Sequence, residues 1–232
     1  MHYVGTELEL FSSAVRWKAY VARLLRPYIR GDVLEVGAGI GAFTEYLRNE
    51  RCAQWTCIEP DEKLFETLSD KFCRGPGEKS SSAICGTLSK TPSGAKYDAI
   101  LYLDVLEHIE NDRAEMAAAA EKLAPSGKLI VLSPAFPSVY SPFDAAIGHY
   151  RRYTRGSLRA IKPEGLREEK SFYIDAPGLL LSLANRLLLK KSYPTSAQIQ
   201  FWDRAIVLVA RLLDPLVFYS FGRSVVTIWS KV

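Results

Sequence analysis

The stretch Glu35-Val36-Gly37-Ala38-Gly39-Ile40-Gly41 decides the fold of this 232-residue chain. The apolar run Val33–Val36 predicts a strand that leads into it, and Ala42–Asn49 follows with the pattern of a helix. Glycines allow the tight backbone turn between the two and let a ligand approach closer than a Cβ would permit. The N-terminus of the helix offers free N–H groups and a partial positive charge. This order of strand, glycine loop and helix predicts a ligand-binding turn at the end of a strand.

A carboxylate ends the next predicted strand, Gln54–Ile58. Glu59 lies 18 residues beyond Gly41, close to the separation of about 20 that is typical of a nucleoside-binding unit, in which the acid accepts the ribose hydroxyls. The segment Gly37–Ala42 also satisfies the pattern G-x-G-x-x-G/A of nicotinamide dinucleotide enzymes. The glycine motif by itself therefore leaves two cofactor classes open.

Short apolar runs alternate with longer amphipathic ones, which predicts an α/β fold with helices packed on a mostly parallel sheet. The further predicted strands are Ser82–Cys85, Tyr97–Leu103, Lys128–Ser133, Glu169–Ile174 and Ser224–Ser230, and the further predicted helices are Leu8–Tyr28, Asp61–Cys73 and Asp112–Leu123. Pro125–Gly127 is expected to be a turn that delivers the chain into the fifth strand. The last two strands suit an antiparallel hairpin at the edge of the sheet.

The composition is that of a globular domain: 48% of the residues are hydrophobic, 24% are charged, and the net charge is +4. Such a modest positive charge does not predict nucleic-acid binding. The four cysteines, at positions 52, 57, 73 and 85, match no zinc pattern and are expected to be free thiols. Neither a secretory signal nor an apolar run long enough for a membrane span is recognisable, so we expect a cytoplasmic protein.

Three features separate the two cofactor classes. Glu35 lies two positions before the first glycine, where it can brace the loop and reach the charged amino group of a methionine-type ligand. No Tyr-x-x-x-Lys pair or separate substrate domain follows, and many hydride-transfer enzymes have one or the other. The predicted C-terminal hairpin is the third feature. Together they favour S-adenosylmethionine over a nicotinamide dinucleotide.

Four segments resemble the successive motifs of class I S-adenosylmethionine-dependent methyltransferases: Val33–Gly41, Ile58–Asp61, Tyr97–Ile109 and Pro125–Leu132. The resemblance covers about residues 15–135 and is closest to the bacterial small-molecule branch that includes the ubiquinone-type O-methyltransferases. It implies a Rossmann-like, seven-stranded sheet in which only the last strand is antiparallel. It also implies that the cofactor lies across the carboxyl ends of the first, second and fourth strands.

The resemblance also implies roles for single residues. The expected cofactor-binding residues are Glu35, Gly37, Ala38, Gly39 and Gly41 for the methionine part, Glu59 and Pro60 for the ribose, Gly86, Thr87 and Leu88 for the adenine, Asp104 for the methionine or sulfonium, and Tyr20 as part of a lid. Trp17 lies in the same lid region. Many members carry an acidic residue for the adenine amino group after the third strand, and this chain does not, so backbone contacts would have to serve there.

His149 is the expected catalytic residue. A histidine that titrates near neutral pH suits general-base work, because an oxygen nucleophile must lose its proton. It lies in Gly148–Thr154, where similar enzymes place residues that face the substrate. The neighbouring side chains expected to bind the acceptor are Arg151, Arg152, Tyr153 and His108. The alternative is a structural loop in which these side chains bond to backbone carbonyls.

The segment Asp104–His108 raises the question of a metal ion. Offsets of three and four would place Asp104, Glu107 and His108 on one face of a helix, with His149 as a fourth ligand. The same Glu-His pair recurs in metal-free relatives, where it caps the helix and braces the cofactor loop. We therefore expect no metal here.

The apolar segments 178–191 and 197–213 carry Ile199, Trp202, Ile206, Val209 and Leu213 at helical spacing, which predicts a core stripe. Leu179–Leu181 and Leu187–Leu189, with Lys190 and Lys191 at their edge, could instead cap a hydrophobic pocket, form a dimer contact or rest on a membrane surface.

The expected domain is single and spans 1–232: a helical lid over 1–30, the cofactor-binding core over 31–135, substrate-side segments with an apolar helical insert over 136–223, and the last strand over 224–232. The expected function is methyl transfer to a small or lipid-like acceptor, most simply at oxygen. The alternatives left open are a methyltransferase for a peptide or protein, an NAD(P)-dependent oxidoreductase, and a scaffold that binds the cofactor without catalysis.

Overall fold

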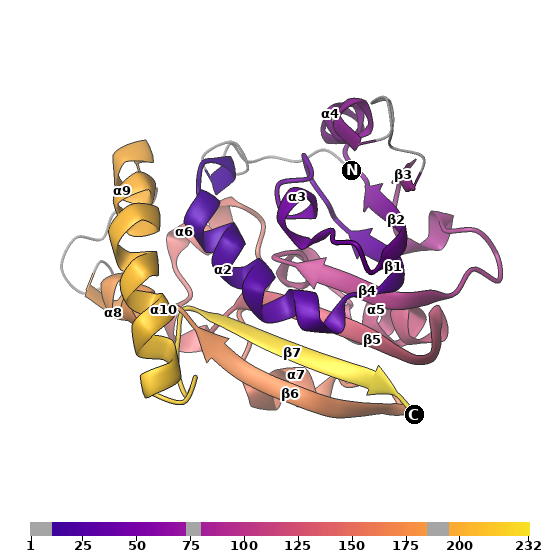
Figure 1. Ribbon diagram of the computed structural model, residues 1–232. Coiled ribbons are helices and arrows are strands. Elements are labelled where there is room, and N and C mark those ends of the chain that lie inside the picture. Colours follow the sequence, from indigo (N-terminus) through magenta and orange to yellow (C-terminus); the bar gives the residue numbers. More distant parts are fainter. Residues whose placement is uncertain (1–10, 73–79, 185–194) are drawn as a thin grey trace.

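The computed structural model describes residues 11–72, 80–184 and 195–232. These residues form one seven-stranded sheet with the strand order β3-β2-β1-β4-β5-β7-β6 (Figure 1). The strands are β1 (Gly31–Val36), β2 (Cys52–Glu59), β3 (Ser81–Cys85), β4 (Tyr97–Leu103), β5 (Leu123–Pro134), β6 (Leu166–Ile174) and β7 (Ser224–Lys231). β7 runs antiparallel to both β5 and β6, and the other pairs are parallel. The Rossmann-like sheet with a single antiparallel last strand is thus confirmed.

Helices cover both faces of the sheet. The α-helices are α2 (Val15–Leu25), α3 (Thr44–Leu47), α4 (Glu62–Phe72), α5 (Asp112–Glu121), α6 (Pro142–Ala146), α7 (Arg155–Ala160), α8 (Ala176–Ala184), α9 (Ser196–Phe201) and α10 (Val207–Leu216). The 3-10 turns are η1 (Arg26–Tyr28), η2 (Leu88–Lys90), η3 (Leu106–His108) and η4 (Pro137–Val139), and Trp202–Ile206 (η6) is a π-helical turn. Because each helix is short, most of its stability must come from the face that it buries against the sheet.

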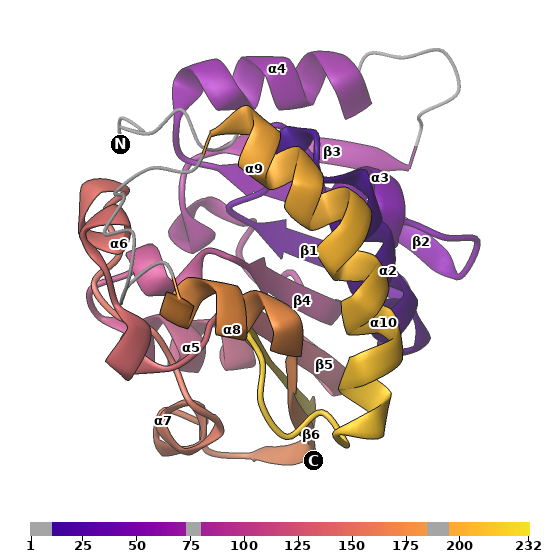
Figure 2. The ribbon, with the colours of Figure 1, turned by 90° about the vertical axis from the view of Figure 1, so that its left-hand side faces the viewer.

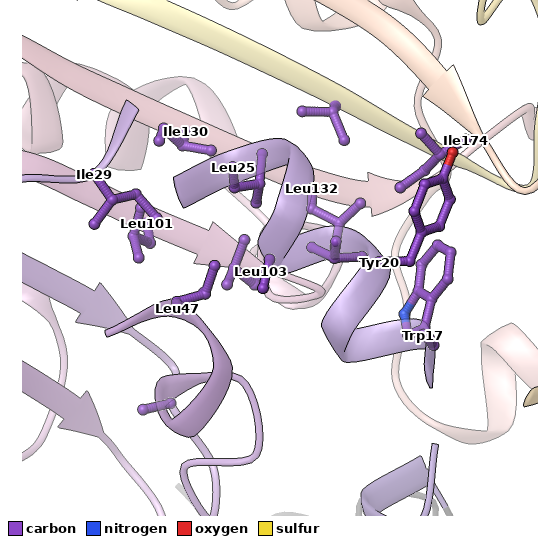
Figure 3. Packing of buried hydrophobic residues seen from close by; sticks show 14 of the residues in the cluster. Trp17, Tyr20, Leu25, Ile29, Leu47, Leu101, Leu103, Ile130, Leu132 and Ile174 are labelled. Carbon is purple, nitrogen blue, oxygen red and sulfur yellow. The ribbon is translucent and has the colours of Figure 1, made fainter. Parts of the chain in front are cut away.

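Alternate residues of the central strands enter two separate cores. Leu101 and Ile130 belong to a cluster with α2, α3, α4 and α10, whereas Ile100 and Val131 belong to a cluster with α5 and α7. In the first cluster Leu25 of α2 lies over residues of β4 and β5, and Tyr20 lies beside Ile174 at the end of β6 (Figure 3). Because both faces of the sheet are covered, residues that point to either face must be apolar, and the buried strands therefore have continuous apolar sequences.

Two local predictions are wrong. The chain enters β5 at Leu123, before the expected turn; Pro125–Gly127 lies inside the strand as an irregularity between the pairs Tyr97–Leu123 and Ala99–Lys128. Ser126, with φ +63°, takes up the extra length. The predicted helix Ala42–Asn49 shortens to α3, since the glycine turn continues to Phe43.

The predicted core stripe is only half right. Ile199, Trp202 and Ile206 pack in the core, but Val209 is 49% exposed. The π-helical turn Trp202–Ile206 inserts extra chain into the helix. The buried positions downstream therefore move one place along, from 209 and 213 to 210 and 214.

Helices α8, α9 and α10 gather with α6 at the end of the sheet to which the β6 arrow points (Figures 1 and 2). No helix among the described residues is long and apolar enough to cross a membrane. The first ten residues of the expected lid, Cys73, and Leu187–Leu189 with Lys190 and Lys191 lie outside the described residues.

Candidate active site

A cavity of about 230 Å³ opens beside the glycine loop at the carboxyl ends of β1, β4 and β5. Its apolar wall consists of Phe11, Trp17, Ala38, Ile40, Ala42, Phe43, Leu103, Pro134, Phe143 and Ile147. Its polar side chains are Ser12, Lys18, Glu35, Asp104, Glu107, His108, Asp144, His149, Arg152, Arg223 and Ser224. Residues from six separate parts of the chain thus meet around one space.

The glycine loop leaves β1 with three left-handed residues, since φ is +67° at Gly37, +57° at Gly39 and +73° at Gly41. Gly37 and Gly39 line the cavity together with Ala38. A Cβ on Gly37 would lie 2.6 Å from the Val105 side chain. Gly41 instead faces away from the cavity, where a Cβ would lie 2.1 Å from the Phe72 ring. Both positions require glycine, one beside the cavity and one for packing of the loop against α4.

Glu59 holds the glycine loop from the end of β2. Its buried carboxylate accepts the Gly39 N–H through Oε2 at 2.8 Å and the Asp61 N–H through Oε1 at 2.9 Å. Burial raises the pKa of Glu59, and these two hydrogen bonds oppose the rise. The residues expected for ribose and adenine, Glu59, Pro60, Gly86, Thr87 and Leu88, come together because β2 and β3 pair at Glu59 and Cys85. None of those five is among the described residues that line the cavity.

Glu35 reaches the cavity wall and also braces the loop from below. Oε2 accepts the Thr44 hydroxyl at 2.7 Å and the Trp55 indole N–H at 3.0 Å. The side chain is buried, and that burial raises the pKa of Glu35 to about 7. The hydrogen bonds from Thr44, Trp55 and Cys57 limit the rise.

Asp104 follows β4 in the left-handed region, with φ +56°, and its side chain is exposed within the cavity. A non-glycine residue in this conformation costs free energy that neighbouring structure must offset; here the Asp104 N–H donates to the Leu132 carbonyl at 2.9 Å. The surrounding protein raises the pKa of Asp104 to about 6, while His149 and Arg223 act in the opposite direction.

His149 is held between two buried carboxylates. Its Nδ1 lies 3.0 Å from Asp144 Oδ1, and its Nε2 lies 3.9 Å from Glu107 Oε1. The His108 ring packs edge-on against it, with 4.6 Å between ring centroids. Burial lowers the pKa of His108 to about 4, and His149 contributes to the same shift. Burial raises the pKa of Glu107 well above its usual range.

Arg152 lines the cavity, but its guanidinium is committed to Asp144. Nε donates to Oδ1 at 2.8 Å and Nη2 donates to Oδ2 at 2.9 Å, which is a bidentate ion pair. This pair, with the hydrogen bonds from His149 and Ser141, holds the pKa of Asp144 well below its usual range against the effect of burial.

Three other expected site residues lie away from the cavity. Arg151 pairs with Asp112 at 2.7 Å, and the Tyr153 hydroxyl donates to the same carboxylate at 2.7 Å. Tyr20 points into the core and donates to Asp214 at 2.7 Å. The sequence does not show which side of the loop or of α2 faces the cavity, because tertiary packing decides that. From α2 it is Trp17 and Lys18 that line the cavity.

Asp144 and Arg223 are site residues that the sequence reasoning missed. A local signal existed for Asp144, because Ser141-Pro142-Phe143-Asp144 has the form of a capping box with proline at the first helical position. No local signal marks Arg223, which enters the cavity from the loop before β7 and pairs with Asp175 at 3.1 Å.

Comparison with known sequences identifies the protein family to which the chain belongs. The sequence model of a methyltransferase domain matches residues 12–168, more than half of the chain. The chain belongs to this methyltransferase family. The match resolves the ambiguity of the glycine motif, since the cofactor of the methyltransferase is S-adenosylmethionine rather than a nicotinamide dinucleotide. No curated protein matches the sequence significantly.

Solved structures show the same fold. The methyltransferase is similar to geranyl diphosphate methyltransferase in complex with SAM, with 15% identity over 98% of this chain and 91% of that one and a TM-score of 0.66. It is also similar to coclaurine N-methyltransferase bound to N-methylheliamine and SAH, with 13% identity, 92% and 72% coverage and a TM-score of 0.60. A third is N-methyltransferase NodS from Bradyrhizobium japonicum WM9 with SAH, with 15% identity, 94% and 88% coverage and a TM-score of 0.58.

The residues of this methyltransferase fit its cofactor. Gly37, Ala38 and Gly39 line the cavity, so the loop presents backbone there. Glu35 and Asp104 place two acidic side chains on the same wall. Carboxylates beside such a loop suit a ligand that carries an amino group and a sulfonium charge.

Proposed function

We propose that this methyltransferase methylates a hydroxyl oxygen of a small, largely apolar acceptor bound in the cavity. The observation that carries the proposal is the mixed lining of the cavity, which combines aromatic and aliphatic side chains with a smaller set of titratable ones. The apolar side chains include Trp17, Phe43 and Phe143, and the titratable ones include Asp104 and His149. An acceptor with an apolar body and one reactive hydroxyl matches such a lining.

The methionine part of S-adenosylmethionine is proposed to lie against Gly37, Ala38 and Gly39, near Asp104 and Glu35. Bound there, the cofactor supplies an electrophilic methyl group: transfer forms a C–O bond in place of the S–CH₃ bond, whose electron pair stays on sulfur, and the hydroxyl loses one proton. The described side chains orient the acceptor and exclude water from the reaction. Glu59 contributes by fixing the Gly39 N–H that shapes the loop.

His149 is the side chain proposed to activate the hydroxyl. Asp144 is a strong acceptor for the Nδ1–H of the ring, so the lone pair resides on Nε2. Nε2 lies on the side of Glu107 and the cavity. Arg152 holds Asp144 in a bidentate pair and thereby fixes the plane in which the imidazole is presented. A carboxylate that orients an imidazole is a recurring arrangement for proton transfer.

The preference for oxygen, and with it the likeness to ubiquinone-type O-methyltransferases, rests on this activating group. Direct transfer to a neutral amine has less need of one, because its lone pair is available without prior deprotonation. The relatives named above include two N-methyltransferases and a geranyl diphosphate methyltransferase. A hydroxylated isoprenoid or phenol is the acceptor chemistry that best combines an apolar body with a proton to be removed.

The proposal extends to acceptors presented at a membrane surface. Leu180 and Leu181 of α8 and Leu208, Leu212 and Leu216 of α10 are exposed, with Leu212 at 73%. The two helices pack against each other at the end of the sheet where the parallel strands finish (Figure 2). Exposed apolar surface on adjacent helices supports contact with lipid.

The decisive experiment offers hydroxylated isoprenoids and phenols, the corresponding amines, and a peptide mixture in parallel, with isotope-labelled methyl donor. The proposal predicts label in an ether product that depends on His149. Label found only in amine or peptide products would overturn it. Calorimetry with S-adenosylhomocysteine and with NAD, run separately, provides the control on cofactor identity.

A further inference from the structure

Arg223 differs from the other lysine and arginine side chains of the cavity in what its donors contact. Lys18 Nζ donates to three backbone carbonyls, the nearest 2.6 Å away. Arg152 donates to both oxygens of Asp144 and to a carbonyl. The Arg223 guanidinium donates no hydrogen bond to any residue that the structure describes, and its polar contact is the ion pair of Nε with Asp175 at 3.1 Å. The N–H groups on its two terminal nitrogens are therefore available to a ligand.

The guanidinium is nevertheless held in one place. Its central carbon lies 4.1 Å from the centre of the Trp202 ring and 5.9 Å from that of the Trp17 ring. The Trp202 indole N–H donates at 2.9 Å to Asp175 Oδ2, the same oxygen that pairs with Arg223. Trp202 begins the π-helical turn Trp202–Ile206, and such turns are frequent at functional sites. Stacking and ion pairing thus orient the guanidinium in advance, which lowers the cost of ordering it when a ligand binds.

Arg223 lies on the side of the site away from the glycine loop. It directly precedes β7, whose first residue, Ser224, pairs with Pro134 at the end of β5. Strands β4 and β5 separate β7 from β1, so at about 4.8 Å per strand the start of β7 lies about 14 Å from the loop. Because the methionine part of the cofactor is proposed to lie against that loop, Arg223 borders the space that remains for the acceptor.

The charges around this space favour an anion beside Arg223. The Arg152 guanidinium is neutralised by Asp144. Asp104 forms no ion pair with Arg223 in the described part of the chain, and its pKa is raised to about 6. Burial raises the pKa of Glu107 well above its usual range, which favours the neutral acid. The cofactor itself carries an amino group and a sulfonium charge against one carboxylate.

From this geometry we infer that Arg223 binds an acidic group on the methyl acceptor, a carboxylate or a phosphate, and so selects acidic acceptors over neutral ones. Two N–H groups of a guanidinium match two oxygens of either group. The inference rests on the proposed function and deepens it, because it adds an acidic group to an acceptor with an apolar body and a hydroxyl. Arg223 makes and breaks no covalent bond; it positions the acceptor for methyl transfer.

The test compares charged and uncharged forms of the same acceptor. Hydroxyaryl carboxylates, hydroxyaryl phosphates and the uncharged amide or ester of each are offered to the full-length protein with labelled S-adenosylmethionine. We expect kcat/KM to favour the acidic form by at least about tenfold, and this preference to fall by at least about tenfold in Arg223→Gln. The series that shows the preference identifies the acidic group. Equal use of both forms by the wild type, or an unchanged preference in Arg223→Gln, would overturn the inference.

Two further variants separate recognition from a loss of structure. Arg167→Gln, at an exposed position of β6 that does not line the cavity, is the matched control and should keep the wild-type preference. Arg223→Lys keeps a positive charge beside Asp175 but lacks the planar fork, so its preference should fall by at least about threefold. This comparison replaces Arg223→Gln if that variant does not fold. Since the ratio of the two acceptor forms is measured within one variant, partial loss of folded protein cancels.

Affinity for S-adenosylhomocysteine decides whether the anion belongs to the acceptor or to the cofactor. Calorimetry should give the same affinity for the wild type and Arg223→Gln. A loss of about tenfold or more would show that Arg223 holds the carboxylate of the cofactor and would overturn the inference.

Amine acceptors and an unreactive ligand distinguish a failure of this inference from a failure of the proposed function. If only aminoaryl acceptors are methylated, with the acids preferred, Arg223 keeps its role and the proposed methylation of oxygen fails. If hydroxyl acceptors are methylated without preference for acids, the proposed function stands and the role of Arg223 is refuted. An aryl carboxylate without hydroxyl or amine, titrated in the presence of S-adenosylhomocysteine, measures the same preference over its amide without turnover.

Discussion

Asp144 Oδ1 lies 3.0 Å from Nδ1 of His149, five residues further along the chain, and it accepts Nε of Arg152 at 2.8 Å as well. The carboxylate is buried at the third position of α6, where its Oδ2 also accepts the Ser141 N–H at 2.8 Å. One side chain therefore caps a helix, neutralises an arginine and sets the orientation of the histidine that faces the cavity.

Replacement of His149 by alanine tests the centre of the site. We expect turnover to fall at least about tenfold, because loss of an acid–base group typically costs 10²–10⁴-fold. Affinity for S-adenosylhomocysteine should change little, since the glycine loop is separate. Tyr150→Phe, at an exposed neighbouring position, is the control and should retain full turnover. Unchanged turnover in His149→Ala would remove His149 from the mechanism.

Asp144→Asn tests whether the carboxylate acts through His149. The amide can no longer neutralise Arg152 or accept on both oxygens, so kcat should fall about tenfold or more while KM for the cofactor is preserved. Breaking the buried pair should also lower stability by about 3–5 kcal/mol. The matched control is Ser141→Ala, which removes one partner of Oδ2 and leaves the bond to His149. An equal loss of kcat in both variants would argue for a purely structural role.

Gly37→Ala tests the glycine cradle. The new Cβ would lie 2.6 Å from Val105 at φ +67°, so we expect affinity for S-adenosylhomocysteine to drop by at least about tenfold and stability to fall by more than the about 1–2 kcal/mol that the left-handed backbone costs alone. Gly94→Ala is the control, because φ is +75° there and nothing lies within 4 Å. Isothermal titration and urea unfolding measure both quantities. Similar losses in the two variants would show that the contact with Val105 has no effect.

Glu35→Gln tests the buried acid below the loop. Because the pKa of Glu35 is raised from 4.5 to about 7 in the folded protein, the folded state binds more protons than the unfolded state between these values, and stability must fall as pH rises through this window. The penalty approaches about 3 kcal/mol above pH 7.

Urea unfolding at pH 5 and pH 8 measures this effect. The difference in stability between the two pH values should shrink in Glu35→Gln by up to that amount. Glu66→Gln, on the exposed face of α4, should leave the difference as it is in the wild type. A wild-type protein that is equally stable at both pH values, with no change in Glu35→Gln, would contradict the prediction.

Leu212→Glu tests the exposed apolar helices. We expect the wild type to cosediment with vesicles of phosphatidylcholine and phosphatidylglycerol. The variant should bind at least about fivefold less, since a charge replaces an apolar side chain that would enter the lipid. Val232→Glu, at the far end of the sheet and 91% exposed, is the control (Figure 1). Light scattering distinguishes the other use of this surface: a dimer that dissociates in Leu212→Glu, without vesicle binding by the wild type, would refute membrane contact.

Much of the fold was predictable because it depends on local patterns. The β4 bounds Tyr97–Leu103 agree with the sequence prediction, and α4 begins one residue later than predicted. The predictions fail where an irregular backbone interrupts the regular spacing of helix or strand residues. A π-helical turn at Trp202–Ile206 shifts a helical stripe, and an irregular strand absorbs the Pro-Ser-Gly segment that reads as a turn.

The sequence by itself determined the cofactor class and the glycine loop of this methyltransferase, because the glycines, Glu35 and Glu59 lie on one strand–loop–helix unit and its neighbouring strand, whose geometry follows from local preference. Only the tertiary structure decided the rest of the site. It turned Tyr20, Arg151 and Tyr153 away from the cavity and brought in Lys18, Asp144 and Arg223. Those side chains come from separate elements, and their meeting depends on packing over long sequence distances that no local pattern encodes.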